Sequence, residues 1–185
     1  MSRRSFLALL GTGSAFTAAA GGAGGYIFHG FNIDDIDDEN RPETTLEEDE
    51  EKRILDLLEI YEIPSLALAQ ELDDSMRYEN AKYSAIGGAV PLSVSQTFKA
   101  LGFQGYKRFS STMTASGIAA YALSEQVQKA EEMLNPTKIT PTTLTEYYGL
   151  TPQNAENFMR SYQHDLSFSA GISATAIALL IGGVD

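Results

Sequence analysis

The spacing of hydrophobic residues along the chain predicts helices from residue 45 onward. Apolar side chains recur three and four residues apart, and no stretch shows the strict alternation of a half-buried strand. The first helix is expected to begin at Thr45, which forms a capping box with Glu48, and to end before Pro64. A second helix is expected from Ser65 to about Tyr83. The stripe that the first helix would bury consists of Ile54, Leu55, Leu57, Leu58 and Tyr61.

The stretch at 85–91, with the sequence AIGGAVP, predicts an interruption of this helical pattern. Adjacent glycines are poor helix formers, and proline lacks the N–H group that a helix interior needs. A short helix is expected next, capped by Ser93 and ending at Gly102. A long helix is then expected from about Ser111 to Leu134.

Residues 143–160 have the spacing of a helix-turn-helix. Gly149 is the expected turn, Thr151 the cap of the second helix, and Pro152 its first residue. The apolar positions of this unit are Leu144, Tyr148, Leu150, Ala155 and Phe158. Binding of DNA would require cations for the phosphates, but Arg160 is the only one between residues 141 and 165. The unit is therefore interpreted as structural, and no nucleic-acid partner is expected.

The C-terminal stretch 166–184 has no charged residue. As a helix it would be about 28 Å long, close to the roughly 30 Å core of a bilayer. Serine, threonine and glycine reduce its hydrophobicity, and no lysine or arginine follows it. We expect a helix that is buried or lies between subunits, with a membrane span through 166–184 as the alternative.

Small residues recur every fourth position in two of the expected helices, which predicts two flat ridges. One ridge consists of Ala170, Ala174, Ala178 and Gly182, and the other of Ser111, Ala115 and Ala119. Such ridges let helix backbones approach closely, in water or in lipid. They are the candidate helix-packing or interface residues. The predicted fold is an all-α, compact bundle of about six helices, with a structural helix-turn-helix-like segment and an apolar C-terminal helix.

Charge separates a linker from the domain that follows it. The chain has 25 acidic and 13 basic residues, and 14 of the acidic ones lie between residues 34 and 62. Residues 21–44 are interpreted as a flexible acidic linker, because like charges repel and no apolar pattern is present. The helical domain would then comprise residues 45–185. A halophilic origin is an alternative explanation of the acidic composition.

Few residues suit catalysis or metal binding. The chain has no cysteine, and its two histidines are His29 and His164, the second of which is interpreted as a helix C-cap. No histidine pair, nucleophile elbow or phosphate-binding glycine loop is present. Two carboxylate pairs, Glu71 with Glu79 and Glu125 with Glu132, are better explained as solvated helix faces than as an acid–base site. We therefore expect no catalytic residues, no metal, no cofactor and no enzymatic activity.

The N-terminus resembles the twin-arginine (Tat) export signal, whose pattern is Ser/Thr-Arg-Arg-x-Phe-Leu. Arg3, Arg4, Phe6 and Leu7 match this pattern, and a mildly hydrophobic segment rich in glycine and alanine follows. The resemblance covers about the first 25 residues. It implies a prokaryotic protein that is exported in folded form, with a signal peptide at 1–20 that is cleaved after Ala20. The alternatives are an uncleaved anchor extending to residue 28 and an ordinary Sec signal.

Together these features predict a function based on binding. We expect an accessory or structural subunit of the prokaryotic cell envelope or surface, acting through contacts with another protein or with itself. Its location would be the periplasm, the cell surface or the extracellular space. The alternative is a membrane-anchored or membrane-active protein, toxin-like or pore-forming, that uses the helix at 166–184.

Overall fold

The computed structural model describes residues 17–22, 46–134 and 139–182. These residues form helices joined by short turns and contain no strand, which confirms the predicted all-α class. A short helix at 17–22 comes first. The remaining elements are α2 (Leu46–Glu59), α3 (Leu66–Ala100), α4 (Gly105–Leu134), α5 (Pro141–Glu146) and α6 (Pro152–Gly182).

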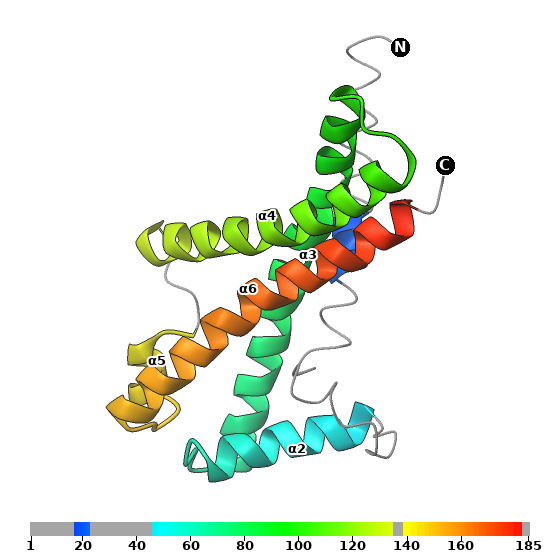
Figure 1. Cartoon of the computed structure of the whole chain (residues 1–185). Helices are drawn as coiled ribbons and strands as arrows, with labels where there is room; N and C mark the ends of the chain where they lie inside the picture. Colours follow the sequence, from blue (N-terminus) through cyan, green and yellow to red (C-terminus); the bar gives the residue numbers. More distant parts are fainter. Residues whose placement is uncertain (1–16, 23–45, 135–138, 183–185) are drawn as a thin grey trace.

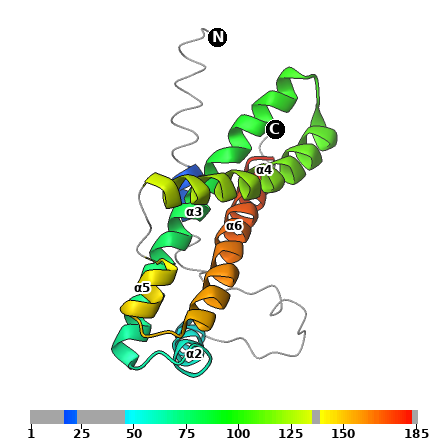
Figure 2. The same cartoon turned by 90° about the vertical axis from the view of Figure 1, so that its left-hand side faces the viewer.

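The three long helices α3, α4 and α6 pack against one another, and α6 contacts both of the others along much of its length (Figure 1). Helix α2 packs on α3, and α5 packs on α6. Both short elements lie at the end of the molecule where α3 and α6 begin. The turn between α3 and α4 lies at the opposite end (Figure 2). The molecule therefore has two ends of different construction.

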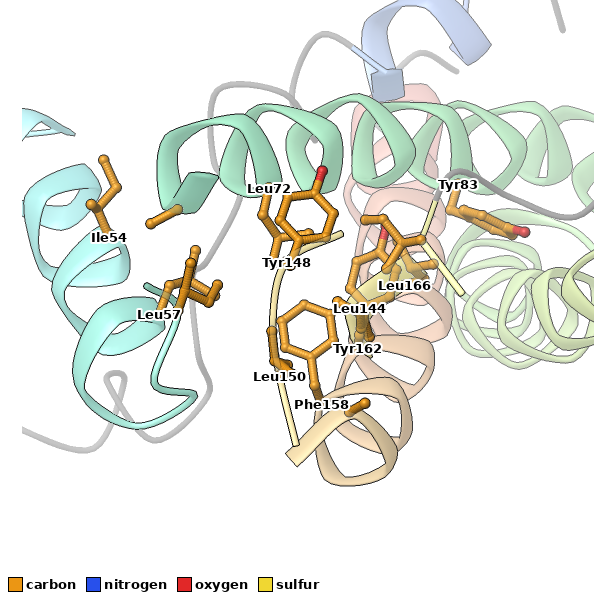
Figure 3. Close-up of a cluster of buried hydrophobic side chains, with 14 residues drawn as sticks. Ile54, Leu57, Leu72, Tyr83, Leu144, Tyr148, Leu150, Phe158, Tyr162 and Leu166 are labelled. Carbon is orange, nitrogen blue, oxygen red and sulfur yellow. The ribbon is translucent and has the colours of Figure 1, made fainter. Parts of the chain in front are cut away.

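Large apolar side chains form a core at the end that contains α2 and α5. They come from α2, from the first half of α3, from α5, from the turn between α5 and α6, and from the first half of α6 (Figure 3). The main members of this cluster, called here the large-residue core, are Ile54, Leu57, Leu72, Leu144, Tyr148, Leu150, Phe158, Tyr162 and Leu166. Burial of such side chains contributes about 1.5–3 kcal/mol each, so this core is the main source of stability at this end.

A buried ion pair connects α2 to α3. The Asp73 carboxylate accepts a hydrogen bond from Arg53 Nε at 3.1 Å and another from Arg77 Nε at 2.9 Å. Its side chain is almost completely buried. A buried carboxylate without partners would be strongly destabilising. Arg53 comes from α2 and therefore joins α2 to α3, whereas Arg77 belongs to α3 itself.

The predicted interruption at 85–91 is wrong, because α3 continues through it without a break. Gly87, Gly88 and Pro91 are all buried inside this helix. A methyl group on Gly87 would clash with the Ala170 carbonyl oxygen of α6. The glycines therefore allow two helix backbones to approach closely, and this packing outweighs their poor helix propensity.

The helix-turn-helix geometry is present as predicted. Gly149 has φ of +76°, a conformation that glycine adopts without strain. The Asn154 N–H donates to Thr151 Oγ1 at 3.2 Å, as expected for a helix cap. The five predicted apolar positions are all buried.

Several predicted helix boundaries differ from those in the structure. Helix α3 does not end near Tyr83, and Ser93, the predicted cap of a short helix, lies inside α3. Helix α4 begins at Gly105, six residues before the predicted start. Helix α6 includes both the second helix of the helix-turn-helix and the uncharged stretch from residue 166. His164 consequently lies inside α6, so its interpretation as a C-terminal cap is wrong. Because a helix continues wherever side chains on one face find packing partners, polar residues at 163–165 did not end it.

Candidate functional site

Small residues fill the region where α3, α4 and α6 meet. On α6, Ala170 and Ala174 have 0% exposure and Ala178 has 1%, and Gly182 is the last residue of the helix. On α4, the fully buried face consists of Thr112, Ser116, Ala120 and Ser124. This region, together with residues 84–91 of α3, is called here the small-residue junction.

The predicted ridge on α4 lies one residue before the face that is buried. Ser111 and Ala115 are half-buried and Ala119 is exposed. Small residues occur in both registers of α4, at 111, 115 and 119 and at 112, 116, 120 and 124. Spacing by itself therefore could not select the face, and the positions of α3 and α6 decide it.

Backbone approaches in the junction are close. A methyl group on Gly117 of α4 would lie 2.8 Å from Thr175 Oγ1 of α6. Ser173 Oγ of α6 donates to the Ser84 carbonyl oxygen of α3 at 2.8 Å. Gly21, in the helix at 17–22, lies next to both Ser84 and Ser173. Four helical segments thus meet with little side-chain volume between them.

Polar side chains also lie inside this region and next to it. Gln128 donates hydrogen bonds to Ser167 Oγ at 2.9 Å and to the Gln163 carbonyl oxygen at 3.2 Å. The hydroxyls of Thr112 and Ser116 are buried and have no hydrogen-bond partner among the described residues. Such groups normally destabilise a folded protein in water.

A cluster of charged residues connects α3 to α4 beside the junction. Lys82 Nζ lies 2.7 Å from Glu131 Oε1 and 3.1 Å from Glu79 Oε2, and the Tyr83 hydroxyl donates to Glu131 at 2.8 Å. Burial lowers the pKa of Lys82, but hydrogen bonds to Glu131 and Glu79 outweigh it, so the pKa is raised overall. Lys82 therefore remains a cation at neutral pH and is unsuited to act as a nucleophile.

Of the two candidate carboxylate pairs, only Glu71 with Glu79 lies wholly within the described residues, and these two carboxylates have different partners. Glu71 accepts a hydrogen bond from the Tyr147 hydroxyl at 3.0 Å, whereas Glu79 binds Lys82. Glu125 is exposed, and the side chain of Glu132 lies outside the described part of the chain. The ion pair of Lys82 with Glu131 joins residues 49 positions apart, so sequence reasoning missed it.

A cavity of about 550 Å³ lies between the charged cluster and α5. Glu79, Tyr83, Gln128, Ile139, Thr140 and Tyr162 are among the residues that line it. The Tyr162 hydroxyl is buried and has no hydrogen-bond partner among the described residues. Burial and the charges of Glu79 and Glu131 raise its pKa, so it remains neutral. The cavity combines this uncharged hydroxyl and apolar walls with the charged side chains of Glu79, Glu156 and Arg160.

An open apolar groove runs along the outer surface between α4 and α6. Its volume is about 760 Å³, and its apolar lining includes Met113, Ile118, Tyr121, Phe168, Ile172 and Leu179. Ile118 is 67% exposed, and Ile172 and Leu179 are also exposed. At one end of the groove the ring of His164 stacks on that of Phe168, with 6.2 Å between the ring centroids. The His164 ring also makes an edge contact with Tyr121, with 6.3 Å between the centroids.

Two further features bear on the predicted chemistry. Among the described residues, no group of three histidine, aspartate or glutamate side chains is arranged to hold a metal ion. One helix in this part of the chain, Pro152–Ile181, is long and apolar enough to cross a membrane, with a mean hydropathy of 1.4. About a third of its most apolar window, 33%, is buried inside the molecule.

Comparison with known proteins found no matching family model, no matching curated protein and no matching solved structure. The candidate export residues Arg3, Arg4, Phe6 and Leu7 lie outside the described residues, as does most of the predicted linker at 21–44.

Sequence reasoning also missed the α4–α6 groove. The signal for it was present, since Ile118, Ile172 and Leu179 are large apolar residues next to the small-residue ridges.

Proposed function

We propose that this protein is a non-enzymatic accessory subunit of the prokaryotic cell envelope that binds a protein partner through the α4–α6 groove. The groove is the observation that carries this proposal. Soluble monomers rarely expose large continuous apolar surfaces, and those that do generally use them for binding. The partner is another envelope protein or a second copy of the chain.

The composition of the groove supports a protein partner. Aromatic residues and methionine are enriched in protein interfaces while charged residues are depleted, and the lining here contains Met113, Tyr121 and Phe168 without a charged residue. The close packing of α4 on α6 gives these side chains a rigid base. A rigid surface loses less conformational entropy when a partner binds.

The test replaces two exposed groove residues by glutamate, Ile118→Glu and Ile172→Glu. We expect the double variant to remain folded but to lose its partner, seen as a lower native mass or as loss of a subunit that co-purifies with the wild type. The matched control is Ile60→Glu, because Ile60 is 62% exposed and lies beyond the end of α2, away from the groove. An unchanged assembly in the groove variant would refute the proposal.

Export by the twin-arginine route is part of this proposal. Replacing Arg3 and Arg4 by lysine should trap the protein inside the cell, because the guanidinium pair, and not charge alone, is what a receptor would recognise. Thr17 would be removed by cleavage after Ala20, and its carbonyl oxygen lies against Gly88 of α3, which supports the alternative in which the signal is not removed. Intact mass of the exported protein distinguishes cleavage after Ala20 from retention of the N-terminus.

Membrane insertion through α6 is the second candidate function, favoured by the hydropathy of Pro152–Ile181. In that case the protein should remain in the membrane pellet after alkaline extraction. A protein that binds only through the groove should be released by that treatment and remain soluble without detergent.

A further inference from the structure

The turn between α3 and α4 exposes apolar and basic side chains together. Leu101 is 66% exposed, Phe103 38% and Tyr106 79%. Lys99 and Lys107 are also exposed, and neither makes an ion pair with a residue that the structure describes. Residues 99–108 are called here the basic tip.

The charge of this segment is opposite to that of the rest of the chain. Between residues 83 and 124 there is no acidic residue, and the three basic ones, Lys99, Lys107 and Arg108, all belong to the basic tip. The whole chain carries a formal charge of −12. The tip lies at the opposite end of the molecule from α2, whose sequence begins LEEDEE (Figure 1). The charges are thus separated along the molecule.

The tip is an ordered turn. Gly102 and Gly105 have φ of +85° and +51°, and a methyl group on either would meet open space. The Phe103 N–H donates to the Phe98 carbonyl oxygen at 3.0 Å, and the centroids of the Phe98 and Phe103 rings lie 5.0 Å apart. These bonds hold the turn closed while Leu101 and Tyr106 extend into solvent. Exposure of the apolar surface of Leu101 and Tyr106 to water is unfavourable, and contact with another surface would remove this cost.

We propose that the basic tip binds the surface of an anionic phospholipid bilayer. Tyrosine is favoured at the level of lipid headgroups, and leucine and phenylalanine gain by entering the outer acyl region. Lysine and arginine beside them bind lipid phosphates and are attracted by the negative surface potential. A nucleic acid would pair with the cations but would leave Leu101 and Phe103 exposed. The combination of groups therefore favours a bilayer.

Vesicle binding by the full-length protein tests this proposal. Co-sedimentation with vesicles of phosphatidylglycerol and phosphatidylcholine is compared with that of vesicles of phosphatidylcholine alone. We expect binding only to the anionic vesicles, and weaker binding at higher salt. The double variant Lys99→Glu/Lys107→Glu should bind at least about tenfold more weakly, because each basic side chain near such a surface contributes about fivefold in affinity. Lys129→Glu, an exposed lysine at the other end of α4, is the matched control and should bind as the wild type does.

Fluorescence provides a second measurement that does not depend on charge variants. The chain has no tryptophan, so Tyr106→Trp introduces a single reporter. Its emission should shift to the blue when anionic vesicles are added. Tyr78→Trp is the control, because Tyr78 is 68% exposed but lies in the first half of α3. A shift at both positions, or at neither, would overturn the proposal.

The inference is independent of the proposed function, since the tip and the groove use different side chains. Groove variants should still bind vesicles, and tip variants should keep the native mass of the wild type. Equal binding of wild type and Lys99→Glu/Lys107→Glu to anionic vesicles would refute the role of the tip. Binding to double-stranded DNA without binding to vesicles would also refute it, in favour of a nucleic-acid partner.

Discussion

The two ends of the molecule are held together in opposite ways. The large-residue core at the α2–α5 end buries leucine, isoleucine, phenylalanine and tyrosine, and its surface combines charged residues with exposed apolar ones such as Leu55 and Ile60. The small-residue junction buries alanine, glycine and serine, and the large apolar residues Ile118, Ile172 and Leu180 lie outside it. The first is stabilised by removal of apolar area from water, and the second by close contact between helix backbones.

This difference shows where function is to be expected. A region that has its large apolar side chains on the outside needs another surface to cover them. The groove and the basic tip both belong to that end. The two regions should consequently respond to opposite kinds of substitution.

Removal of volume from the large-residue core should have the largest effect. Leu72→Ala creates a cavity at a site with 0% exposure and should lower the free energy of unfolding by about 2–5 kcal/mol. Leu55→Ala is the control. The periodicity placed Leu55 in the buried stripe of the first helix, but its side chain is 46% exposed, so this substitution should be tolerated. Urea unfolding of both variants measures the difference. Equal losses would mean that the core is not the main source of stability.

Addition of volume should damage the small-residue junction. Ala174→Leu places a large side chain at a position with 0% exposure between helices, at an expected cost of about 1–3 kcal/mol. Ala176→Leu, on the exposed side of the same helix, is the control and should cost much less. Thermal unfolding in detergent-free buffer compares them. If both substitutions are equally tolerated, α6 does not pack closely at Ala174.

Alkaline pH should destabilise the chain through the large-residue core. Burial raises the pKa of Tyr61, Tyr148 and Tyr162 above their ordinary value of 10.0. Above that pH the unfolded chain loses these protons while the folded one keeps them, so stability falls. For Tyr162 the loss is about 1.4 kcal/mol for each pH unit above 10. Measurement of the free energy of unfolding at several pH values between about 9 and 11 tests this prediction.

The variant Tyr162→Phe isolates this contribution. It has no proton to lose, so its stability should decline less steeply above pH 10 than that of the wild type. A decline as steep as in the wild type would show that Tyr162 is not the buried group responsible.

The smallest expected effect is a gain in stability from a substitution in the small-residue junction. Ser116→Ala removes a buried hydroxyl that has no partner among the described residues, and alanine is the better helix former. We expect an increase of about 1 kcal/mol in the free energy of unfolding. The control is Ser124→Ala, since Ser124 Oγ donates to the Tyr121 carbonyl oxygen at 2.7 Å and its removal loses a hydrogen bond. A loss of stability in Ser116→Ala would reveal a partner for that hydroxyl.

Hydrophobic periodicity, caps and turn residues were sufficient for the fold class and for several local structures. The helix-turn-helix was predictable because Gly149, Thr151 and the apolar positions around them act within a few residues of one another. The continuity of α3 was not predictable, because Gly87 is a helix breaker in isolation and a contact residue only when Ala170 lies against it. The candidate interface was predicted in part, since the spacing identified the small residues of α6 but could not choose between two registers on α4.

The sequence by itself determined the all-α class, the cap at Thr151, the distribution of charge and the presence of small-residue ridges, because each of these depends on neighbours along the chain. The tertiary structure alone decided which ridge of α4 is buried, that Lys82 bridges Glu79 and Glu131, and that the large apolar residues of α4 and α6 form one groove. The physical reason is distance along the chain. Contacts between residues far apart in sequence depend on how whole helices cross, and a crossing is selected by the combined packing of all their faces.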